Sequence, residues 1–236
     1  MSNSNLNPLV DGDILVYRVG FAVKDDEPLE YALATMRSVL NTIYDRFPES
    51  QYHKLYLSGK GNYREQLATL AVYKGNRDPS HRPHYYEELK QYMIDHHDAI
   101  VVDGQEADDA IVQEQWKNKD KSTVIVSIDK DLRTCPGFHY NPVKLVLDYV
   151  SLANANYSFF EQMLTGDRTD NIPGIKGVGP KTAEKMLAPC QKEVVKMKQV
   201  VMDQYNKQYG SDAWKYYKEI SNLLWIRREE GVECPF

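Results

Sequence analysis

The sequence predicts an α/β fold, in which a mostly parallel central sheet is flanked by helices and followed by a helical C-terminal lobe. Short apolar segments rich in β-branched residues alternate with helical patterns, which is typical of such a sheet. Strand patterns stop near residue 151, and helical patterns continue to the end. The 236 residues, 42% of them hydrophobic, suffice for a buried core. We expect the α/β core to span residues 1–155 and the helical lobe residues 156–236.

The first strand is expected at Leu9 and Val10, ending in a turn at 11–13 that presents a carboxylate before Ile14 to Val16. Apolar residues at helical spacing predict a helix at 28–47. Further elements of the core are expected as strands at 54–57, 99–102 and 123–128 and as a helix at 107–117. Parallel sheets of this kind bind ligands at the carboxyl ends of their strands.

Helices of the lobe are expected around 158–164, 181–187, 192–205 and 213–226. The polar segment 76–83 contains two prolines that oppose a continuous helix, so we expect it to be the most mobile part of the chain.

The formal charge of −5 at first argues against a nucleic-acid partner, because cations supply most non-specific affinity for DNA. However, residues 54–82 carry six basic side chains against two acidic ones, and residues 168–198 carry seven against three. Much of the acidic excess lies in compact carboxylate clusters that a divalent cation would neutralise.

The three cysteines are widely spaced and form no CxxC pair, which indicates neither a zinc site nor a disulfide framework and favours a reducing cytoplasm. No stretch offers the roughly 18 continuous apolar residues that a membrane span requires. The sequence therefore predicts a soluble protein that is not secreted and does not contact a membrane.

Acidic residues occur in four places where strands or loops are expected to end. They are Asp11; Glu106, Asp108 and Asp109; Asp129 and Asp131; and Asp167 and Asp170. Taken singly, each is more often a helix cap or a solvated turn, and the group at 106–109 equally suits the positive end of a helix dipole. Taken together, converging carboxylates without a histidine or cysteine set indicate Mg²⁺ or Mn²⁺.

The segment Tyr73-Lys74-Gly75-Asn76-Arg77 joins an aromatic residue to two cations three positions apart. On one turn of helix these cations would grip a single phosphate, and the alternative is an ordinary solvated basic helix.

The segment from Asn171 to Ala183 contains Gly174, Gly177 and Gly179 and leads directly into a helix. Glycines let a phosphate approach the backbone closely, and a helix start offers free N–H donors. This is the pattern of a helix-hairpin-helix motif at about 164–188, with a purely structural glycine-rich turn as the alternative.

These motifs, in this order over nearly the whole chain, resemble the flap endonuclease family, and most closely the bacteriophage 5′-3′ exonucleases and the 5′-nuclease domain of bacterial DNA polymerase I. PIN-domain ribonucleases share scattered acids with this pattern but lack the hairpin tail. The resemblance implies a PIN-like nuclease core with an arch or clamp at about 60–97. It also implies two Mg²⁺ or Mn²⁺ ions, with K⁺ at the hairpin.

The resemblance further implies a role for each motif residue. Asp11, Glu106, Asp108 and Asp109 would form or support one metal site, and Asp129, Asp131, Asp167 and Asp170 the second or its water shell. Lys74 and Arg77 would contact the scissile phosphate at the base of the arch. Expected DNA contacts are Arg64, Tyr73 (by stacking on a terminal base), Gly174, Lys176, Gly177, Gly179, Lys181 and Thr182.

The chain departs from the family pattern at the end of the second strand, where relatives carry a further metal-site aspartate shortly before an arginine. Here Gly59 precedes Arg64 without a carboxylate. Asp13 would substitute only if the first strand persisted through Gly12. The segment between Arg77 and Glu106 is also short, which leaves an open clamp as an alternative to a closed arch.

The expected activity is two-metal hydrolysis of DNA at 5′ ends, flaps or junctions, by a monomer in the cytoplasm of a bacterium or a phage-infected cell. The compact length favours a phage origin, and the resemblance implies a role in DNA replication. Two alternatives stay open at this point: a DNA-binding clamp whose catalytic site has decayed, and a ribonuclease acting on RNA–DNA hybrids.

Overall fold

The computed structural model of the chain describes residues 5–24, 26–78, 80–118 and 122–236. Pro79, within the proline-containing segment at 76–83, lies outside the described residues. The chain forms two compact units, and each is discontinuous in sequence. Unit 1 comprises Met1–Gly61, Pro79–Leu132 and Gly137–Tyr149, and unit 2 comprises Asn62–Asp78, Arg133–Pro136 and Val150–Phe236.

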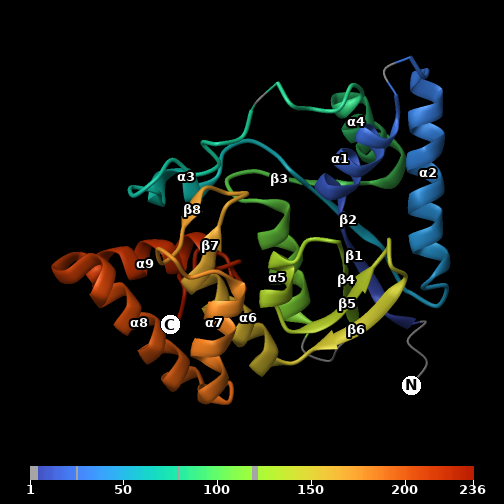
Figure 1. Cartoon of the computed structure of the whole chain (residues 1–236). Coiled ribbons are helices and arrows are strands. Elements are labelled where there is room, and N and C mark those ends of the chain that lie inside the picture. The colour runs from blue at the N-terminus through green and yellow to red at the C-terminus, as the bar shows by residue number, and fades with distance from the viewer. Residues whose placement is uncertain (1–4, 25, 79, 119–121) are drawn as a thin grey trace. The chain divides into compact units, whose positions relative to one another are not determined.

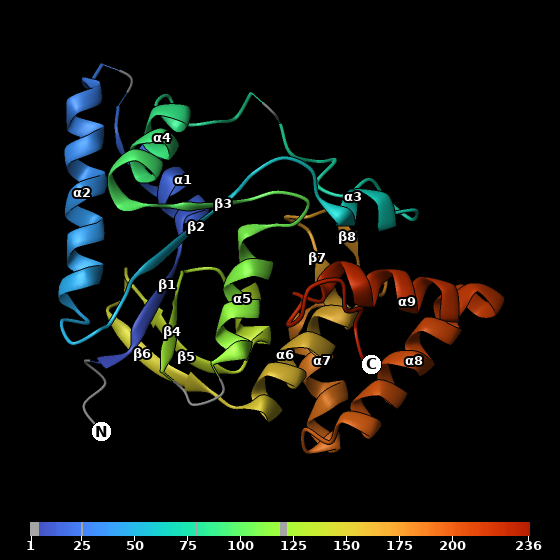
Figure 2. The same cartoon turned by 180° about the vertical axis from the view of Figure 1, so that it is seen from behind.

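The sheet of unit 1 has six strands in the order β3-β2-β1-β4-β5-β6 (Figures 1 and 2). The pairs β2–β3, β1–β2, β1–β4 and β4–β5 are parallel, which confirms the predicted mostly parallel sheet. The strands are β1 (Asn7–Asp11), β2 (Lys54–Ser58), β3 (Ile100–Val102), β4 (Thr123–Val126), β5 (Gly137–Asn141) and β6 (Val146–Val150). Because β1 to β4 are parallel, their carboxyl ends share one edge of the sheet.

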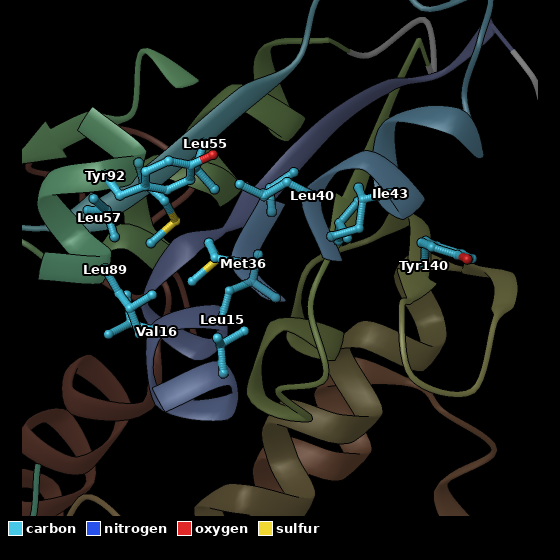
Figure 3. Packing of buried hydrophobic residues seen from close by; sticks show 14 of the residues in the cluster. Leu15, Val16, Met36, Leu40, Ile43, Leu55, Leu57, Leu89, Tyr92 and Tyr140 are labelled. Carbon is cyan, nitrogen blue, oxygen red and sulfur yellow. The ribbon is translucent and has the colours of Figure 1, made fainter. Parts of the chain in front are cut away.

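The helices of unit 1 lie on both faces of its sheet. They are α1 (Gly12–Ala22), α2 (Leu29–Asp45), α4 (Tyr86–His97) and α5 (Ala107–Lys117). Alternate strand residues such as Val10, Leu57 and Val126 pack with α1, α2 and α4 in one apolar core. Figure 3 labels Leu57 together with core residues of the three helices. The intervening residues, such as Leu9 and Ile125, are buried outside that core, and α5 contacts β1, β2 and β4. This alternation follows from the twofold side-chain period of a strand.

Unit 2 is mainly helical and has its own apolar core. Its elements are α3 (Tyr63–Leu67), α6 (Leu152–Thr165), β7 (Gly166–Asp167), β8 (Ile172–Pro173), α7 (Pro180–Leu187), α8 (Val194–Tyr209) and α9 (Ala213–Leu224). Short 3-10 turns lie at Asp131–Thr134, Ala188–Cys190 and Gly210–Asp212. None of the helices in the described part of the chain is long and apolar enough to cross a membrane.

Several sequence predictions were wrong about local structure. The turn expected at 11–13 is instead the end of β1 and the start of helix α1, because Asp11 caps that helix directly after the strand. Strand pairing does not stop at residue 151, since β7 and β8 form a short antiparallel pair at 166–173. Lys74 lies in a turn with φ +55°, so the basic segment at 73–77 is not a turn of helix.

Candidate functional site

The predicted carboxylates of unit 1 gather at the carboxyl edge of the sheet. Asp11 is the last residue of β1, and its side chain accepts a hydrogen bond from the N–H of Ile14 at 3.1 Å, which caps α1. Its other oxygen accepts from the hydroxyl of Ser127, just beyond β4, at 2.7 Å. The same hydroxyl oxygen accepts the N–H of Asp129 at 2.9 Å. Ser127 therefore joins two of the predicted metal-site aspartates.

The start of α5 supplies the next group of carboxylates. The side chains of Glu106 and Asp109 each accept from the other's backbone N–H in a capping box, with Asp109 fully buried. This confirms that the pair caps a helix, and it fixes the first turn of α5, which carries Asp108. Asp131 begins the following 3-10 turn, and its N–H donates to Asp129 at 2.8 Å.

The carboxylates of this edge raise one another's pKa. Burial raises the pKa of Asp11 to about 7, with further increases from the negative charges of Asp13 and Asp129, although its bonds to Ser127 and Ile14 oppose the shift. Burial also raises the pKa of Asp108 well above its usual range, and the charges of Asp11 and Asp129 add to the effect. The edge therefore favours a bound cation, because each deprotonated carboxylate destabilises its neighbours.

The described side chains that meet at this edge offer carboxylate and hydroxyl oxygens, which suit Mg²⁺ or Mn²⁺ better than a zinc ion. Within the described residues, no three histidine, cysteine, aspartate or glutamate side chains form a group that could hold a metal ion as they stand. The local hydrogen bonds of Asp11, Asp109 and Asp129 account for this arrangement. Binding an ion would thus require side-chain rotations, whereas the backbone frame is already in place.

Two residues of this edge, Asp13 and Gly59, have contacts that the sequence did not predict. Asp13, considered only as part of a strand, lies in the first turn of α1 and accepts the N–H of Ser58 at 3.0 Å. Gly59 follows β2, and a Cβ added there would come within 2.1 Å of a carboxylate oxygen of Asp103. The signal for Asp13 was present in the Asp-x-Asp spacing, but its contact with Ser58 depends on the pairing of β1 with β2.

The predicted phosphate-binding cations lie in unit 2, where they contact Asp170. The guanidinium of Arg77 is 2.6 Å from one Asp170 oxygen, and the ammonium of Lys74 is 3.7 Å from the other. The hydroxyl of Tyr73 donates to Asp170 at 2.7 Å, and the Lys74 N–H donates to the Asp170 carbonyl at 2.8 Å. The structure thus joins two sets of residues that the sequence analysis had assigned to different roles.

Asp167 shares the loop after α6 with Asp170. It is the last residue of β7, is 3% exposed and accepts the N–H of Thr169 at 2.7 Å. The side chain of Asn76 donates to the carbonyl of Arg168 at 2.6 Å, and that of Asn171 donates to the carbonyl of Val72 at 2.9 Å. These bonds hold the basic segment at 73–77 against the loop at 167–171.

Two expected DNA contacts have structural roles instead. Arg64 is 2% exposed, and its guanidinium donates to the carbonyls of Leu223 and Trp225, each at 3.0 Å. Tyr73 is 7% exposed and packs in the core of unit 2, so its ring is not presented for stacking on a base. The sequence did not predict the burial of Arg64 and Tyr73, because it depends on contacts with residues about 100 or more positions away.

The glycine-rich segment forms a tight connection between β8 and α7. A Cβ at Gly174 would lie 2.2 Å from the backbone of Thr165, so this glycine permits backbone packing and does not leave room for a phosphate. Gly177, with φ +80°, and Gly179 have no atom within 4 Å of an added Cβ. The expected DNA contacts that are exposed here are Lys176, Gly177, Gly179, Lys181 and Thr182.

No family model matches the chain, but named relatives do. A flap endonuclease Xni from Shewanella putrefaciens is 27% identical over 194 residues, covering 76% of this chain and 72% of the relative. A 5′-3′ exonuclease from Buchnera aphidicola is 24% identical over 204 residues, covering 74% of this chain and 67% of the relative. DNA polymerase I from Caldicellulosiruptor bescii is 28% identical over 209 residues, covering 76% of this chain. The chain matches only 24% of that polymerase's length.

Solved structures share the fold. The bacteriophage T5 flap endonuclease in a complex with DNA and metal ions aligns with a TM-score of 0.57 and 16% identity, covering 93% of this chain and 99% of the T5 chain. The catalytic core of Rad2 in complex with a DNA substrate aligns with a TM-score of 0.54 and 14% identity, covering 97% of this chain and 83% of the other.

Proposed function

Because this chain belongs to the family of flap endonucleases and 5′-3′ exonucleases, we propose that it is a structure-specific 5′-nuclease that hydrolyses phosphodiester bonds of DNA. The observation that carries the proposal is the set of mutually repelling carboxylates at the sheet edge of unit 1. A protein that only bound DNA would gain nothing from buried, repelling anions near phosphate. A metal-dependent hydrolase requires them.

Asp11, Asp108 and Asp129 are the proposed direct ligands, and Asp131 supports the same edge. Glu106 and Asp109 fix the first turn of α5 through their capping box, and we propose that they support the ion or its bound water from there. Asp167 and Asp170 are proposed to support a second ion from the loop after α6. When bound, two divalent ions would supply hydroxide at neutral pH and stabilise the leaving oxygen.

Lys74 and Arg77 are proposed to hold the reacting phosphate, for which they must exchange their contacts with Asp170 for contacts with DNA. The loss of the Arg77 contact costs little, because the side chain of Arg77 is 46% exposed and exposed ion pairs contribute only about 0.2–1 kcal/mol. Asp170 keeps the hydrogen bond from the Tyr73 hydroxyl. In return, the two cations gain charge-assisted hydrogen bonds to a phosphodiester, which carries one negative charge, as Asp170 does, and gains a second as hydroxide attacks.

The duplex beside the cut is proposed to lie on the exposed part of the hairpin, where Gly177 and Gly179 leave the backbone open. Lys176, Lys181 and Thr182 would contact the phosphates, and K⁺ bound by carbonyls would add to the attraction. Such contacts read backbone shape, so we expect cleavage to depend on DNA structure more than on sequence. The proposed substrates are 5′ ends, flaps and junctions, acted on by a monomer in the cytoplasm during DNA replication.

The proposal is tested by incubating the purified chain with 5′-flap DNA, nicked duplex DNA and an RNA–DNA hybrid, with Mg²⁺ and with EDTA. We expect Mg²⁺-dependent cleavage near the flap junction and slower removal of nucleotides from 5′ ends. Cleavage of the hybrid alone would favour a ribonuclease. Tight binding of flap DNA without cleavage in either Mg²⁺ or Mn²⁺ would favour a DNA-binding clamp.

A further inference from the structure

The end of β2 is crowded at position 59, where a glycine supplies no carboxylate. The N–H of Gly59 donates to the carbonyl of Val102 at 2.7 Å, which holds it against the end of β3. A Cβ at this glycine would lie 2.1 Å from a carboxylate oxygen of Asp103 and 2.9 Å from the Val102 carbonyl oxygen. Asp103 is in turn fixed by the N–H of Lys60, at 2.6 Å. A metal ligand at this strand end must therefore come from another segment.

Asp13 reaches the same strand end from helix α1. One of its oxygens, Oδ2, accepts the N–H of Ser58, the last residue of β2. The other, Oδ1, is buried and has no hydrogen-bond partner among the residues that the structure describes. An unpaired buried carboxylate oxygen is costly, so this oxygen is poised to accept a cation or a cation-bound water.

The charged groups that face Asp13 come from three helices. Asp11 caps α1 and Glu106 caps α5, and both add negative charge around Asp13. Lys90, from α4, is the cation that acts on Asp13, and its ammonium donates to the Ser58 carbonyl at 2.8 Å. One ammonium faces three carboxylates, which leaves a net negative charge that a divalent ion would neutralise.

We propose that Asp13 supplies the carboxylate that position 59 lacks, and that its Oδ1 binds a divalent ion toward which the side chains of Asp11 and Glu106 rotate. This inference rests on the proposed metal-dependent function. Ser58 holds the groups around Asp13 in place through its own hydrogen bonds. Its N–H holds Asp13, its carbonyl holds Lys90, and its hydroxyl oxygen accepts the N–H of Ala107 at the start of α5, at 2.9 Å.

The test compares two aspartates at neighbouring strand ends in the full chain without DNA. Asp13→Asn retains an oxygen for the Ser58 N–H and replaces the free oxygen with an amide that repels cations. Asp103→Asn removes one negative charge beside Gly59. Mn²⁺ affinity is measured by calorimetry. We expect Asp13→Asn to weaken one Mn²⁺ site by about tenfold or more, and Asp103→Asn to leave both affinities within about twofold of the parent chain.

An unchanged Mn²⁺ affinity in Asp13→Asn, or an equal loss in Asp103→Asn, would overturn the inference while leaving the proposed nuclease function intact. If the parent chain neither binds Mn²⁺ nor cuts flap DNA, the proposed function itself fails, and the inference fails with it. Near-ultraviolet circular dichroism verifies the fold of each variant. Asp13→Thr, whose hydroxyl can also accept the Ser58 N–H, replaces Asp13→Asn if that variant does not fold.

Discussion

Arg77 and Asp170 lie in direct contact, with the guanidinium Nη2 2.6 Å from the carboxylate Oδ1. Lys74 and Tyr73 contact the same carboxylate. A cation expected to hold phosphate is thus neutralised by an anion expected to support a metal ion. In the proposed function, the DNA phosphate would bind Arg77 and the metal ion would bind Asp170, so that the pair separates.

Replacing Asp170 with Asn tests that competition. We expect flap DNA to bind several-fold more tightly, because Lys74 and Arg77 lose their carboxylate partner, and the salt dependence of binding to steepen by about one phosphate contact. Turnover falls, since a proposed metal support is lost. Affinity is measured by fluorescence anisotropy across a salt series, with Ca²⁺ replacing Mg²⁺ to prevent cleavage. Weaker binding in the variant would show that the pair holds the basic segment in its DNA-binding form.

Replacing Arg77 or Lys74 with Gln tests the proposed phosphate contact. We expect single-turnover cleavage to slow by roughly a hundredfold in each case, because the lost charge stabilises the reacting phosphate. Gln at position 74 keeps a long side chain in a turn whose φ is +55°. Lys181→Gln, in the exposed first turn of α7, serves as the contrast. It should weaken binding and reduce the salt slope by about one, with the single-turnover rate preserved. Equal behaviour of all three variants would contradict this division of roles.

The pKa of Asp11 predicts how stability depends on pH without metal. The pKa is about 7 in the folded protein, against about 3.9 for an unfolded chain. Between these values the folded state binds more protons, so this contribution to stability is complete below about pH 4 and is lost as the pH rises through 7. We expect the Tm measured in EDTA to fall by several degrees between pH 5 and pH 8.

Two controls assign that pH dependence to the carboxylate cluster. Asp11→Asn should flatten the decline, because the variant has no proton to release at this position. Mg²⁺ at millimolar concentration should raise the Tm most at pH 8, where the carboxylates are ionised and repel one another. A Tm in EDTA that rises from pH 5 to pH 8 would contradict the burial of Asp11 as an uncompensated carboxylate.

Arg64→Ala should destabilise unit 2 by about 2–4 kcal/mol, because it leaves the buried carbonyls of Leu223 and Trp225 without their donor. The expected effect on DNA affinity at a temperature where the variant is folded is less than about twofold. Chemical denaturation and anisotropy measure the two quantities separately. A variant of normal stability that bound DNA poorly would restore Arg64 to the DNA-contacting surface.

Gly59→Asp should fail to improve the response to Mg²⁺, contrary to what the family pattern alone suggests. The new side chain would displace Asp103 and press on the Val102 carbonyl, at a cost of about 1–3 kcal/mol. The double variant Gly59→Asp with Asp103→Gly relieves the first conflict and should recover much of the lost stability. Half-maximal activity at a lower Mg²⁺ concentration in the single variant would show that position 59 faces the ions.

Sequence patterns predicted the parts of this fold that are set by local periodicity. The helix at 107–117 and the strand at 54–57 were expected almost to the residue, because the spacing of their apolar residues determines them. The strand β5 was missed because its residues, from Gly137 to Asn141, include glycine, histidine and asparagine, and pairing with β4 determines it.

The sequence predicted which residues form the site, but not which residues they hydrogen-bond. The position of Asp11 followed from a strand that ends in a carboxylate, whereas its bond to Ser127 joins segments 116 positions apart. Asp13 was undervalued because Gly12 suggested a turn, and the helix that begins there turns the side chain toward Ser58. Contacts between distant segments also placed Arg64 inside unit 2, where charge alone had suggested a surface.

The burial of Arg64 also constrains when unit 2 can fold during synthesis. Its two carbonyl partners, at positions 223 and 225, are made about 160 residues later. A growing chain therefore lacks both acceptors of this guanidinium until residue 225 has been added. Helix α3 cannot adopt its final packing before the last residues of α9 have emerged from the ribosome, so unit 2 cannot complete its folding before that point.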